Sequence, residues 1–299
     1  MTNIAGMPAG IFIKKVRKQR RLSQQELAID ILDRTLISRL EKGKYMPPYD
    51  KLAQLVERLG FGADIIGTDE RQWKGEIEGL LSRRETDLAE RLIDKLENDD
   101  GFISNEINRQ FLIVAKVAAA IIKKEIPGKI FAFIRKGLSI TIPFFNEKYI
   151  EDYLLTGNDI QLINQLTITY WDTGERDKAI DLMMALIRNF DKSCADLRYR
   201  SQHYPTLVYN LTSYLRDMKR NEEALHLCDM GIVLCLSANA LFTLPLLISN
   251  KACCLLDMNN RDESLHLFRQ SFYLFDAYRM FDHKETERLF VKDNFGISL

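Results

Sequence analysis

The side chains best suited to chemistry form a short stretch that begins at residue 34. If Ile37 and Leu40 face the inside of a helix, five residues face outward: Arg34, Thr35, Leu36, Ser38 and Arg39. Arginine can bind a guanine edge or a phosphate, the hydroxyls can bind either, and leucine can contact a thymine methyl group. These residue types predict contacts with double-stranded DNA in the major groove.

A capping-box spacing defines the helix that precedes this stretch. Ser23 and Glu26 have the S-x-x-E pattern, in which each side chain accepts a hydrogen bond from the other residue's backbone N–H. The helix then begins at Gln24, where exposed amide N–H groups suit a phosphate. Asp33 can cap the next helix, and Gly43 can end it because glycine adopts a left-handed conformation without strain. Two short helices joined by a tight turn predict a helix-turn-helix.

The formal charge of zero is unevenly distributed along the chain. Residues 1–60 hold twelve Lys/Arg and six Asp/Glu, whereas the other 239 residues hold 30 and 36. A basic segment joined to an acidic body predicts a polyanionic partner for the first sixty residues.

The composition predicts no membrane segment, cofactor or catalytic residue. The most apolar run, FLIVAKVAAAII (111–122), is too short to span a bilayer and contains Lys116, so we expect a buried helix. The five cysteines form no CxxC motif, and their odd number and the lack of a signal peptide predict a reducing cytoplasm. There is no P-loop, nucleophile elbow or HExxH motif, which argues against an enzyme.

Two similar hexapeptides, EEALHL (222–227) and DESLHL (262–267), indicate a structural repeat, and a third copy lies upstream. The copies are spaced by 45 and 40 residues, which is typical of stacked helix pairs and not of a catalytic motif. Each copy has a small residue at the same place, where the two helices of a pair are expected to approach closely: Ala179, Ala224 and Ser264.

The histidines of these hexapeptides, His226 and His266, stand at equivalent places in separate copies, and the third copy has Asp181 there. A metal site needs side chains that converge on one point. Equivalent positions of stacked repeats do not converge, so both histidines are expected on the surface and no metal is predicted.

Amide side chains recur on the first helix of each repeat. Asn210 and Asn250 occupy matching positions, and Asn164 or Gln165 occupies the place in the earlier copy. First helices of stacked pairs line a concave face, and an amide can both donate to and accept from a peptide backbone. These four residues are therefore predicted to hold an extended peptide. The alternative is that each asparagine bonds the backbone of its own repeat.

The motifs LSQQELA (22–28) and ISRLEKGKYMP (37–47) resemble the helix-turn-helix domain of Cro/cI-type phage repressors. The resemblance implies an ion pair between Arg17 and Glu41 that joins the first and third helices. Eight residues and no glycine separate the two motifs, one residue fewer than the usual pattern. A tighter or differently shaped turn is therefore expected.

The later residues resemble tetratricopeptide repeats, and the best copy contains Tyr170, Gly174, Ala179, Ile180 and Met183. A helix-turn-helix joined to such repeats is similar to the Rgg/PlcR type of peptide-responsive regulator in Gram-positive bacteria. The resemblance implies an all-α fold with a helix-turn-helix DNA-binding domain in residues 1–66. It places a right-handed superhelical array of tetratricopeptide-like helix pairs, for peptide binding and dimerisation, in residues 67–299.

The same resemblance implies a cytoplasmic homodimer that binds operator DNA with an inverted repeat. It also implies a short signalling peptide, as in quorum sensing, that alters the DNA-bound state. Two alternatives stay open: a repressor whose repeats only dimerise or bind a partner protein, and a repeat scaffold that inhibits a signalling enzyme.

Overall fold

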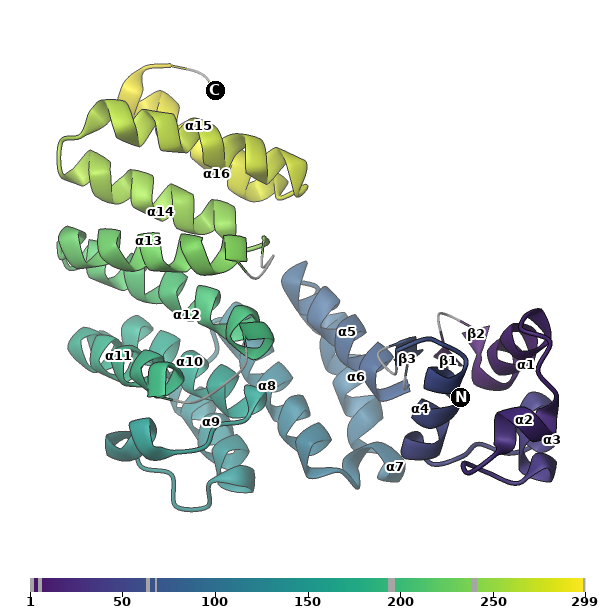
Figure 1. Ribbon diagram of the computed structural model, residues 1–299. Helices are drawn as coiled ribbons and strands as arrows, with labels where there is room; N and C mark the ends of the chain where they lie inside the picture. Colours follow the sequence, from purple (N-terminus) through teal and green to yellow (C-terminus); the bar gives the residue numbers. More distant parts are fainter. Residues whose placement is uncertain are drawn as a thin grey trace. The chain divides into compact units, whose positions relative to one another are not determined.

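The computed structural model describes residues 3–4, 7–62, 65–67, 69–192, 197–237, 241–297 and 299. The chain divides into two compact units, residues 1–115 and 116–299. Nearly all the described residues lie in helices or the turns between them (Figure 1), which confirms the all-α fold class.

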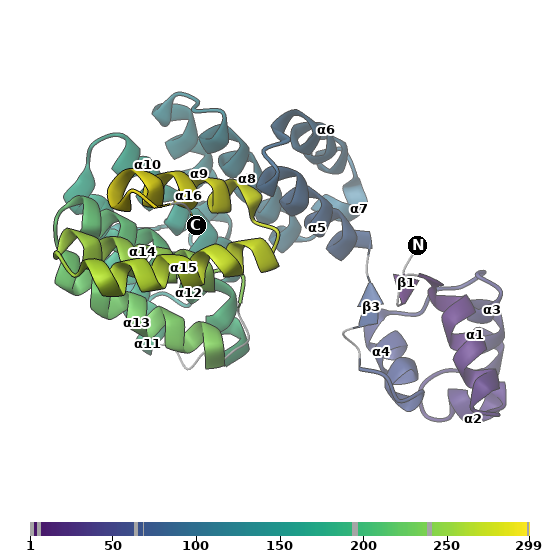
Figure 2. The same cartoon turned by 90° about the horizontal axis from the view of Figure 1, so that it is seen from above.

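The first unit begins with a four-helix head whose helices are α1 (Ala9–Gln19), α2 (Gln24–Ala28), α3 (Arg34–Glu41) and α4 (Tyr49–Arg58). Figure 2 shows α1 and α3 side by side. Their apolar stripes form one core in which the largest wholly buried side chains include Ile13, Leu27, Ile37, Leu40 and Leu55. The helical spacing of these residues in the sequence is the reason that one face of each helix is buried.

A small antiparallel sheet, which the sequence did not indicate, covers one side of the head. Its strands are β1 (Asn3–Ile4), β2 (Met7–Pro8) and β3 (Ile66–Gly67), in the order β2-β1-β3. Ile4 pairs with Ile66 and both side chains are wholly buried, so the sheet joins the two ends of the head to its core.

The predicted helix ends of the head are confirmed. The Ser23 hydroxyl accepts from the Glu26 N–H at 3.1 Å, and the Glu26 carboxylate accepts from the Ser23 N–H at 2.6 Å. Asp33 caps α3 by accepting from the Thr35 N–H at 2.6 Å. Gly43 has a φ of 68°, the left-handed conformation that ends the helix.

Four further helices complete the first unit or cross its boundary: α5 (Asp69–Ser82), α6 (Thr86–Glu97), α7 (Asp100–Ile103) and α8 (Glu106–Ile122). They share a core that includes Ile77, Ile93, Phe102 and Phe111. The apolar run 111–122 lies in α8 and is largely buried, as expected.

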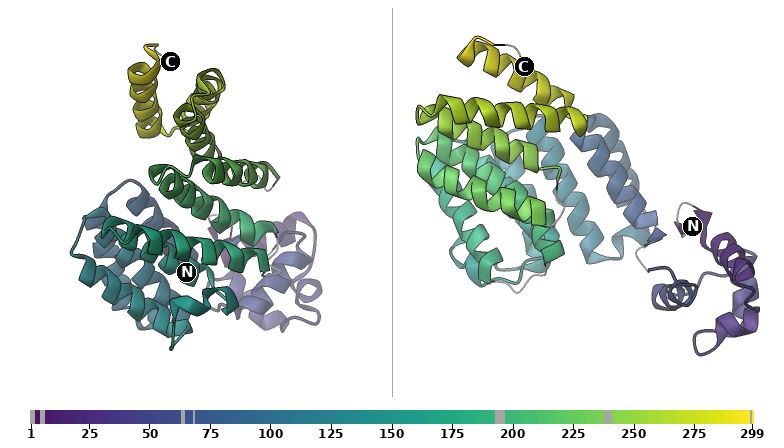
Figure 3. Two further views of the ribbon diagram at one scale, coloured as in Figure 1. Left: turned by 90° about the vertical axis from the view of Figure 1, so that its left-hand side faces the viewer. Right: turned by 45° about the horizontal axis from the view of Figure 1, so that its top comes forward.

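The second unit is a stack of successive helices (Figures 1 and 3). Its elements are α9 (Pro127–Thr141), the 3₁₀ helix η2 (Glu147–Asp152), α10 (Gly157–Asp172), α11 (Arg176–Lys192), α12 (Leu197–Asp217), α13 (Asn221–Ser237), α14 (Leu244–Asp257), α15 (Arg261–Ala277) and α16 (Phe281–Phe295). The three predicted repeats are the pairs α10–α11, α12–α13 and α14–α15.

Equivalent residues shape the turn and the packing of each pair. Ala179, Ala224 and Ser264 are wholly buried where the second helix meets the first. The residue that ends the first helix has positive φ in all three pairs: 87° at Gly174, 63° at Lys219 and 64° at Asn259. The repeat therefore imposes a left-handed conformation even where lysine replaces glycine, which confirms the repeat read from the sequence.

Candidate nucleic-acid interface and cavities of the helix array

Helix α3 presents a polar outer face. Arg34, Thr35 and Arg39 are exposed, and Leu36 and Ser38 are half-buried. The two residues predicted to face inward, Ile37 and Leu40, are wholly buried. The structure thus brings all five predicted α3 residues to one accessible surface, at the helix that follows the tight turn.

The two arginines of this face have no acidic partner in the described part of the chain. No described carboxylate pairs with Arg34 or Arg39, although ion pairs are frequent elsewhere on the surface. Each guanidinium carries five N–H donors, so this face offers unused donors and two positive charges to a polyanion.

The turn between α2 and α3 uses Asp30 where the usual pattern has glycine. Asp30 has a φ of 57°, a left-handed conformation that Asp and Asn tolerate better than other side chains. The N–H groups of Ile31 and Leu32 both donate to the Ala28 carbonyl at 3.0 Å. These bonds close the turn within the eight-residue spacing.

A bidentate ion pair fixes α3 against α1. Arg17 donates from Nε to Glu41 Oε1 at 2.6 Å and from Nη2 to Oε2 at 2.9 Å, and both side chains are buried. Gln24 donates its side-chain N–H to Glu41 Oε2 at 2.8 Å. Burial opposes the charged carboxylate, but the hydrogen bonds from Arg17 and Gln24 and the Arg17 charge outweigh it and lower the pKa of Glu41.

The implied Arg17–Glu41 pair is therefore present, and Gln24 is shown to have a structural role. The Gln24 side chain is bound to Glu41, so the backbone N–H groups at the start of α2 are the donors that the sequence analysis assigned to a phosphate. A glycine helps to bring the same helices together: a Cβ at Gly10 of α1 would lie 2.0 Å from the Leu40 carbonyl oxygen of α3. The sequence analysis did not identify Gly10.

Two of the residues predicted to bind a peptide line a cavity between α10 and α12. This α10–α12 cavity has a volume of about 270 Å³, and its lining includes Gln161, Asn164, Gln165, His203 and Leu207. Burial lowers the pKa of His203, because the charged imidazolium is desolvated. The lining thus combines amides, an imidazole and a hydroxyl with apolar groups, and no carboxylate, lysine or arginine lies among its residues.

Asn210 lies close to the same cavity, but its side-chain amide is hydrogen-bonded to another residue of the protein. Its Nδ2 donates to Asn164 Oδ1 at 2.9 Å, which joins α12 to α10. Asn250 is buried, and its Nδ2 lies 3.2 Å from the Tyr209 carbonyl and 2.9 Å from each of the Thr212 and Ser213 hydroxyl oxygens. Both amides thus link adjacent repeats. The prediction that they hold a peptide stays a prediction.

Asn250 also lines a second cavity, of about 230 Å³, between α12, α14, α15 and α16. This α12–α16 cavity contains charged residues that the sequence analysis did not identify, Arg216 and Glu287. Burial raises the pKa of Glu287 to about 7, although hydrogen bonds from Ser249 and Ser271 partly oppose the shift. No sequence signal marked Glu287, because α16 lies outside the three repeats.

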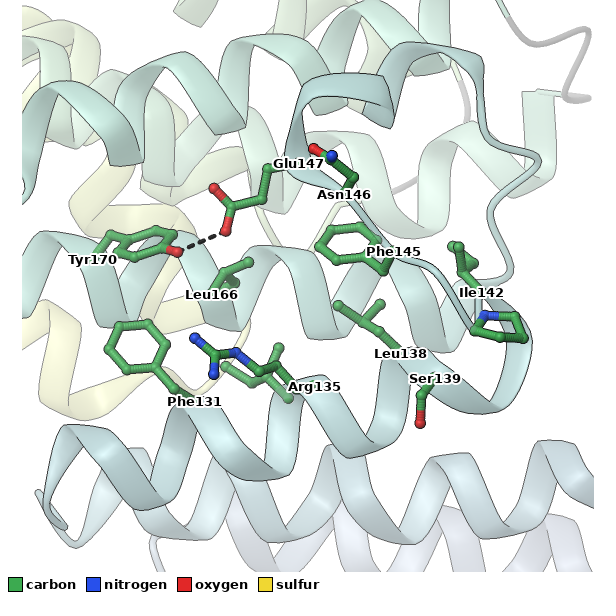
Figure 4. A pocket seen from close by; sticks show the side chains of 12 residues that line it. Phe131, Arg135, Leu138, Ser139, Ile142, Phe145, Asn146, Glu147, Leu166 and Tyr170 are labelled. Atoms are coloured by element: carbon green, nitrogen blue, oxygen red, sulfur yellow. Dashed lines mark hydrogen bonds between the residues drawn. The ribbon is translucent and has the colours of Figure 1, made fainter.

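A larger pocket, of about 520 Å³, lies between α9, the segment 142–147 and α10 (Figure 4). In this α9–α10 pocket, Arg135 and Leu138 of α9 face Leu166 and Tyr170 of α10, and Phe145 of the segment 142–147 stands at one side. The sequence analysis did not predict this pocket, because the segment that walls it belongs to no repeat.

The remaining sequence predictions concern metals and membranes. His226 and His266 are exposed on α13 and α15, as expected for surface residues. Within the described residues, no cluster of three or more His, Cys, Asp or Glu side chains is arranged to hold a metal ion. None of the described helices combines the length and apolar character needed to cross a membrane.

Comparison with known sequences identifies relatives of the head. Residues 10–66 match a family model described as a helix-turn-helix domain. Over 99 residues the chain is 32% identical to the immunity repressor protein of Bacillus phage phi105, and the match spans 32% of this chain and 69% of that protein.

Comparison with solved structures extends the likeness to nearly the whole chain. Bacillus thuringiensis PlcR in complex with the peptide PapR7 and DNA has a TM-score of 0.67 at 21% identity, covering 94% of this chain and 98% of PlcR. The Streptococcus dysgalactiae SHP pheromone receptor Rgg2 gives 0.62 at 12%, covering 95% and 99%. ComR from S. thermophilus, in complex with DNA and its signalling peptide ComS, gives 0.57 at 13%, covering 97% and 100%. Rgg2 is named a pheromone receptor, and ComR from Streptococcus vestibularis is named a competence regulator.

Proposed function

This chain belongs to the helix-turn-helix family of DNA-binding regulators and shares the fold of PlcR, Rgg2 and ComR, and from this premise we propose that it is a transcriptional regulator controlled by a short peptide. One observation carries the proposal: a helix with an exposed basic face and a stack of repeats with amide-lined cavities occur in the same chain.

DNA recognition is assigned to α3. Its first turn carries Arg34 and Thr35, and the recognition helix of such domains places its N-terminal residues nearest the bases. Arg39 lies one turn further on, where it contacts a base edge or a phosphate. The N-terminus of α2 at Gln24 supplies backbone N–H groups to a second phosphate.

Two copies of the chain form the DNA-binding species. In this proposal residues 1–66 bind DNA and residues 67–299 bind the peptide and dimerise. A two-fold symmetric dimer presents two α3 helices, so the operator is an inverted repeat with half-site centres roughly 34–36 Å apart or a multiple of that distance.

The peptide is assigned to the cavities on the first helices of the repeats. Asn164, Gln165, Asn210 and Asn250 all lie in or beside these cavities. A carbonyl group of the peptide competes with Asn164 Oδ1 for the Asn210 donor, so binding exchanges one amide hydrogen bond for another. The peptide regulates DNA binding only through its different affinity for two dimer geometries, a coupling of about 1–3 kcal/mol in typical cases.

The DNA half of the proposal is tested by selecting bound fragments from genomic DNA of the source organism with the purified full chain. The selected operator is then titrated with the wild type and with Arg34→Ala and Arg39→Ala. Each substitution should weaken binding by about 1–3 kcal/mol if the arginine reads a base. Arg91→Ala, on the exposed surface of α6, is the matched control. Equal affinities for all four proteins would contradict the assignment of α3.

The peptide half is tested by calorimetry with a synthetic heptapeptide library, followed by operator titration with and without each binding peptide. Asn164→Ala should weaken the binding of an active peptide. Tight operator binding without any bound peptide would refute the sensor function and leave DNA binding in place.

That result would favour a second function, a repressor whose repeats only dimerise or bind a partner protein. The observation in its favour is that the donors of Asn210 and Asn250 already bind protein acceptors. The likeness of the head to a phage immunity repressor is consistent with it.

A further inference from the structure

The α9–α10 pocket is separate from the cavities assigned to the peptide. On α10, Tyr170 lies nine residues after Gln161, and at 100° per residue this spacing puts the two side chains on opposite faces of the helix. Leu166 and Tyr170 line the α9–α10 pocket, whereas Gln161 and Asn164 line the α10–α12 cavity. The two sites therefore lie on opposite faces of α10, and a molecule bound in one does not contact the face that lines the other.

The floor of the pocket is apolar. Ile134, Leu138 and Leu166 are buried beneath it, and Phe131 and Phe145 stand half-buried at its sides. Phe131 packs against Tyr170 with ring centroids 5.2 Å apart. A volume of about 520 Å³ is within the usual range for small-molecule sites.

The acidic residue of the pocket already has partners within the protein. Glu147 accepts a hydrogen bond from the Tyr170 hydroxyl at 2.6 Å, and Lys178 Nζ lies 3.4 Å from its other oxygen. Lys178 also lies 3.9 Å from the centroid of the Tyr170 ring. The carboxylate thus binds one hydroxyl donor and lies close to one cation. Little of its negative charge is left for a cationic ligand.

Arg135 is the cation available to a ligand. It is exposed at the mouth of the pocket, and none of the described carboxylates forms an ion pair with it. Asn146, at the same mouth, accepts the Lys148 N–H through Oδ1. Its Nδ2 group can therefore donate to a ligand beside Arg135.

Contacts outside the pocket hold its third wall in place. Glu151 of η2 pairs with Arg188 at 2.6 Å and with Lys192 at 2.5 Å. Asn189 donates to the carbonyls of Ile150 and Tyr153 at 2.9 and 2.8 Å. Residues 150–153, which follow the pocket-lining segment, are thereby tied to α11, and the bond from Tyr170 to Glu147 holds the segment itself against α10.

We propose that the α9–α10 pocket binds a small amphipathic carboxylic acid, with the carboxylate on Arg135 and the apolar chain against the half-buried rings of Phe131 and Phe145. The inference goes beyond the peptide-controlled function and does not depend on it. Arg135 can pair with a carboxylate through a fork of two N–H donors, and the accessible aromatic rings beside it offer an apolar surface to the chain.

The test uses octanoate as the probe, with calorimetry on the purified full chain. Octanoate should bind, octylamine should not, and 1-octanol should bind more weakly than octanoate. Lengthening the chain from hexanoate to octanoate should tighten binding on the order of tenfold, because two more methylene groups are buried. Octylamine binding as tightly as octanoate would refute the role of Arg135.

Two variants of neighbouring cations on α9 provide the matched comparison. Arg135→Gln should weaken octanoate binding at least tenfold, and Lys136→Gln, which removes an exposed charge outside the pocket, should leave it unchanged. Gln161→Ala, in the α10–α12 cavity, should also leave it unchanged. Equal affinity of Arg135→Gln and the wild type, or loss of binding in Gln161→Ala, would overturn the proposed site.

Discussion

Asn210 on α12 donates to Asn164 on α10 across 2.9 Å, so two residues that the sequence marked as peptide ligands bind each other. The bond joins the first helices of adjacent repeats, 46 residues apart in the chain. It gives these amides a structural role in the array in addition to the role proposed in peptide binding.

A double-mutant cycle measures that structural role. Asn164→Ala and Asn210→Ala should each lower the free energy of unfolding by about 1 kcal/mol, the typical net value of one hydrogen bond. The double variant should cost less than the sum, because the two substitutions remove the same bond. Urea denaturation gives all four values. Gln161→Ala, in the same cavity, is the control. Additive costs would mean that the bond contributes nothing.

The buried pair of the head is expected to be far more costly to break. Glu41→Gln strands the Arg17 guanidinium, and truncating one partner of a buried pair costs about 3–5 kcal/mol. The matched control is Glu85→Gln in the exposed Arg83–Glu85 pair, which should cost no more than about 1 kcal/mol. Chemical denaturation of both variants decides the comparison, and similar losses would contradict it.

The same pair makes the free energy of unfolding fall at acid pH. The pKa of Glu41 is lower in the folded state than its ordinary value of 4.5, so the unfolded chain binds the proton more readily. The contribution of the pair is complete above pH 4.5 and is lost as pH falls through the folded pKa. Glu41→Gln should remove this part of the acid destabilisation, which denaturation midpoints between pH 3 and 6 would show.

Glu287 has the opposite pH dependence. Its folded pKa of about 7 lies above the ordinary 4.5, so the folded chain binds the proton more readily. Below pH 4.5 Glu287 is protonated in both the folded and the unfolded chain, so it does not make stability depend on pH. As the pH rises from 4.5 to 7, the unfolded chain loses this proton first and the folded state becomes progressively less stable. Glu287→Gln should therefore stabilise the protein by about 2–3 kcal/mol at pH 8 and have little effect at pH 4.5.

The control for Glu287 lies two residues earlier on α16. Hydrogen bonds from Arg288 lower the pKa of Glu285, which is exposed. Glu285→Gln should therefore give the same pH dependence between 5 and 8 as the wild type. A Glu287→Gln profile parallel to the wild type across that range would show that Glu287 keeps its ordinary pKa.

In the turns of the repeats, replacing lysine by glycine and replacing glycine by lysine should have opposite effects on stability. Lys219 and Gly174 share the left-handed conformation, which costs an L-residue about 1–2 kcal/mol and glycine almost nothing. Lys219→Gly should raise the unfolding free energy by about 1 kcal/mol, and Gly174→Lys should lower it by a similar amount. Lys219→Ala also removes the exposed bond to Asp257 but keeps the Cβ, so it should not stabilise. A stability gain in Lys219→Ala would point to the charge and not to the backbone.

Local patterns in the sequence predicted most of the helices and turns correctly. The Ser23–Glu26 capping box, the Asp33 cap and the glycine at 43 each depend on residues within one helical turn. The inward positions of α3 and the small residues of the repeats follow from the helical period and from the 45- and 40-residue spacings. Such signals can be read from neighbours in the chain because the same neighbours form the bonds.

Tertiary structure alone determined which distant partner each polar side chain meets. The amide of Asn210 could bind a peptide or a protein acceptor, and only the packing of α12 against α10 placed Asn164 within reach. Likewise, the raised pKa of Glu287 comes from desolvation by surrounding helices, and the α9–α10 pocket forms where the segment 142–147 lies beside α9 and α10. Composition and period fix which faces of a helix are apolar, whereas hydrogen-bond partners and desolvation depend on how helices distant in sequence pack together.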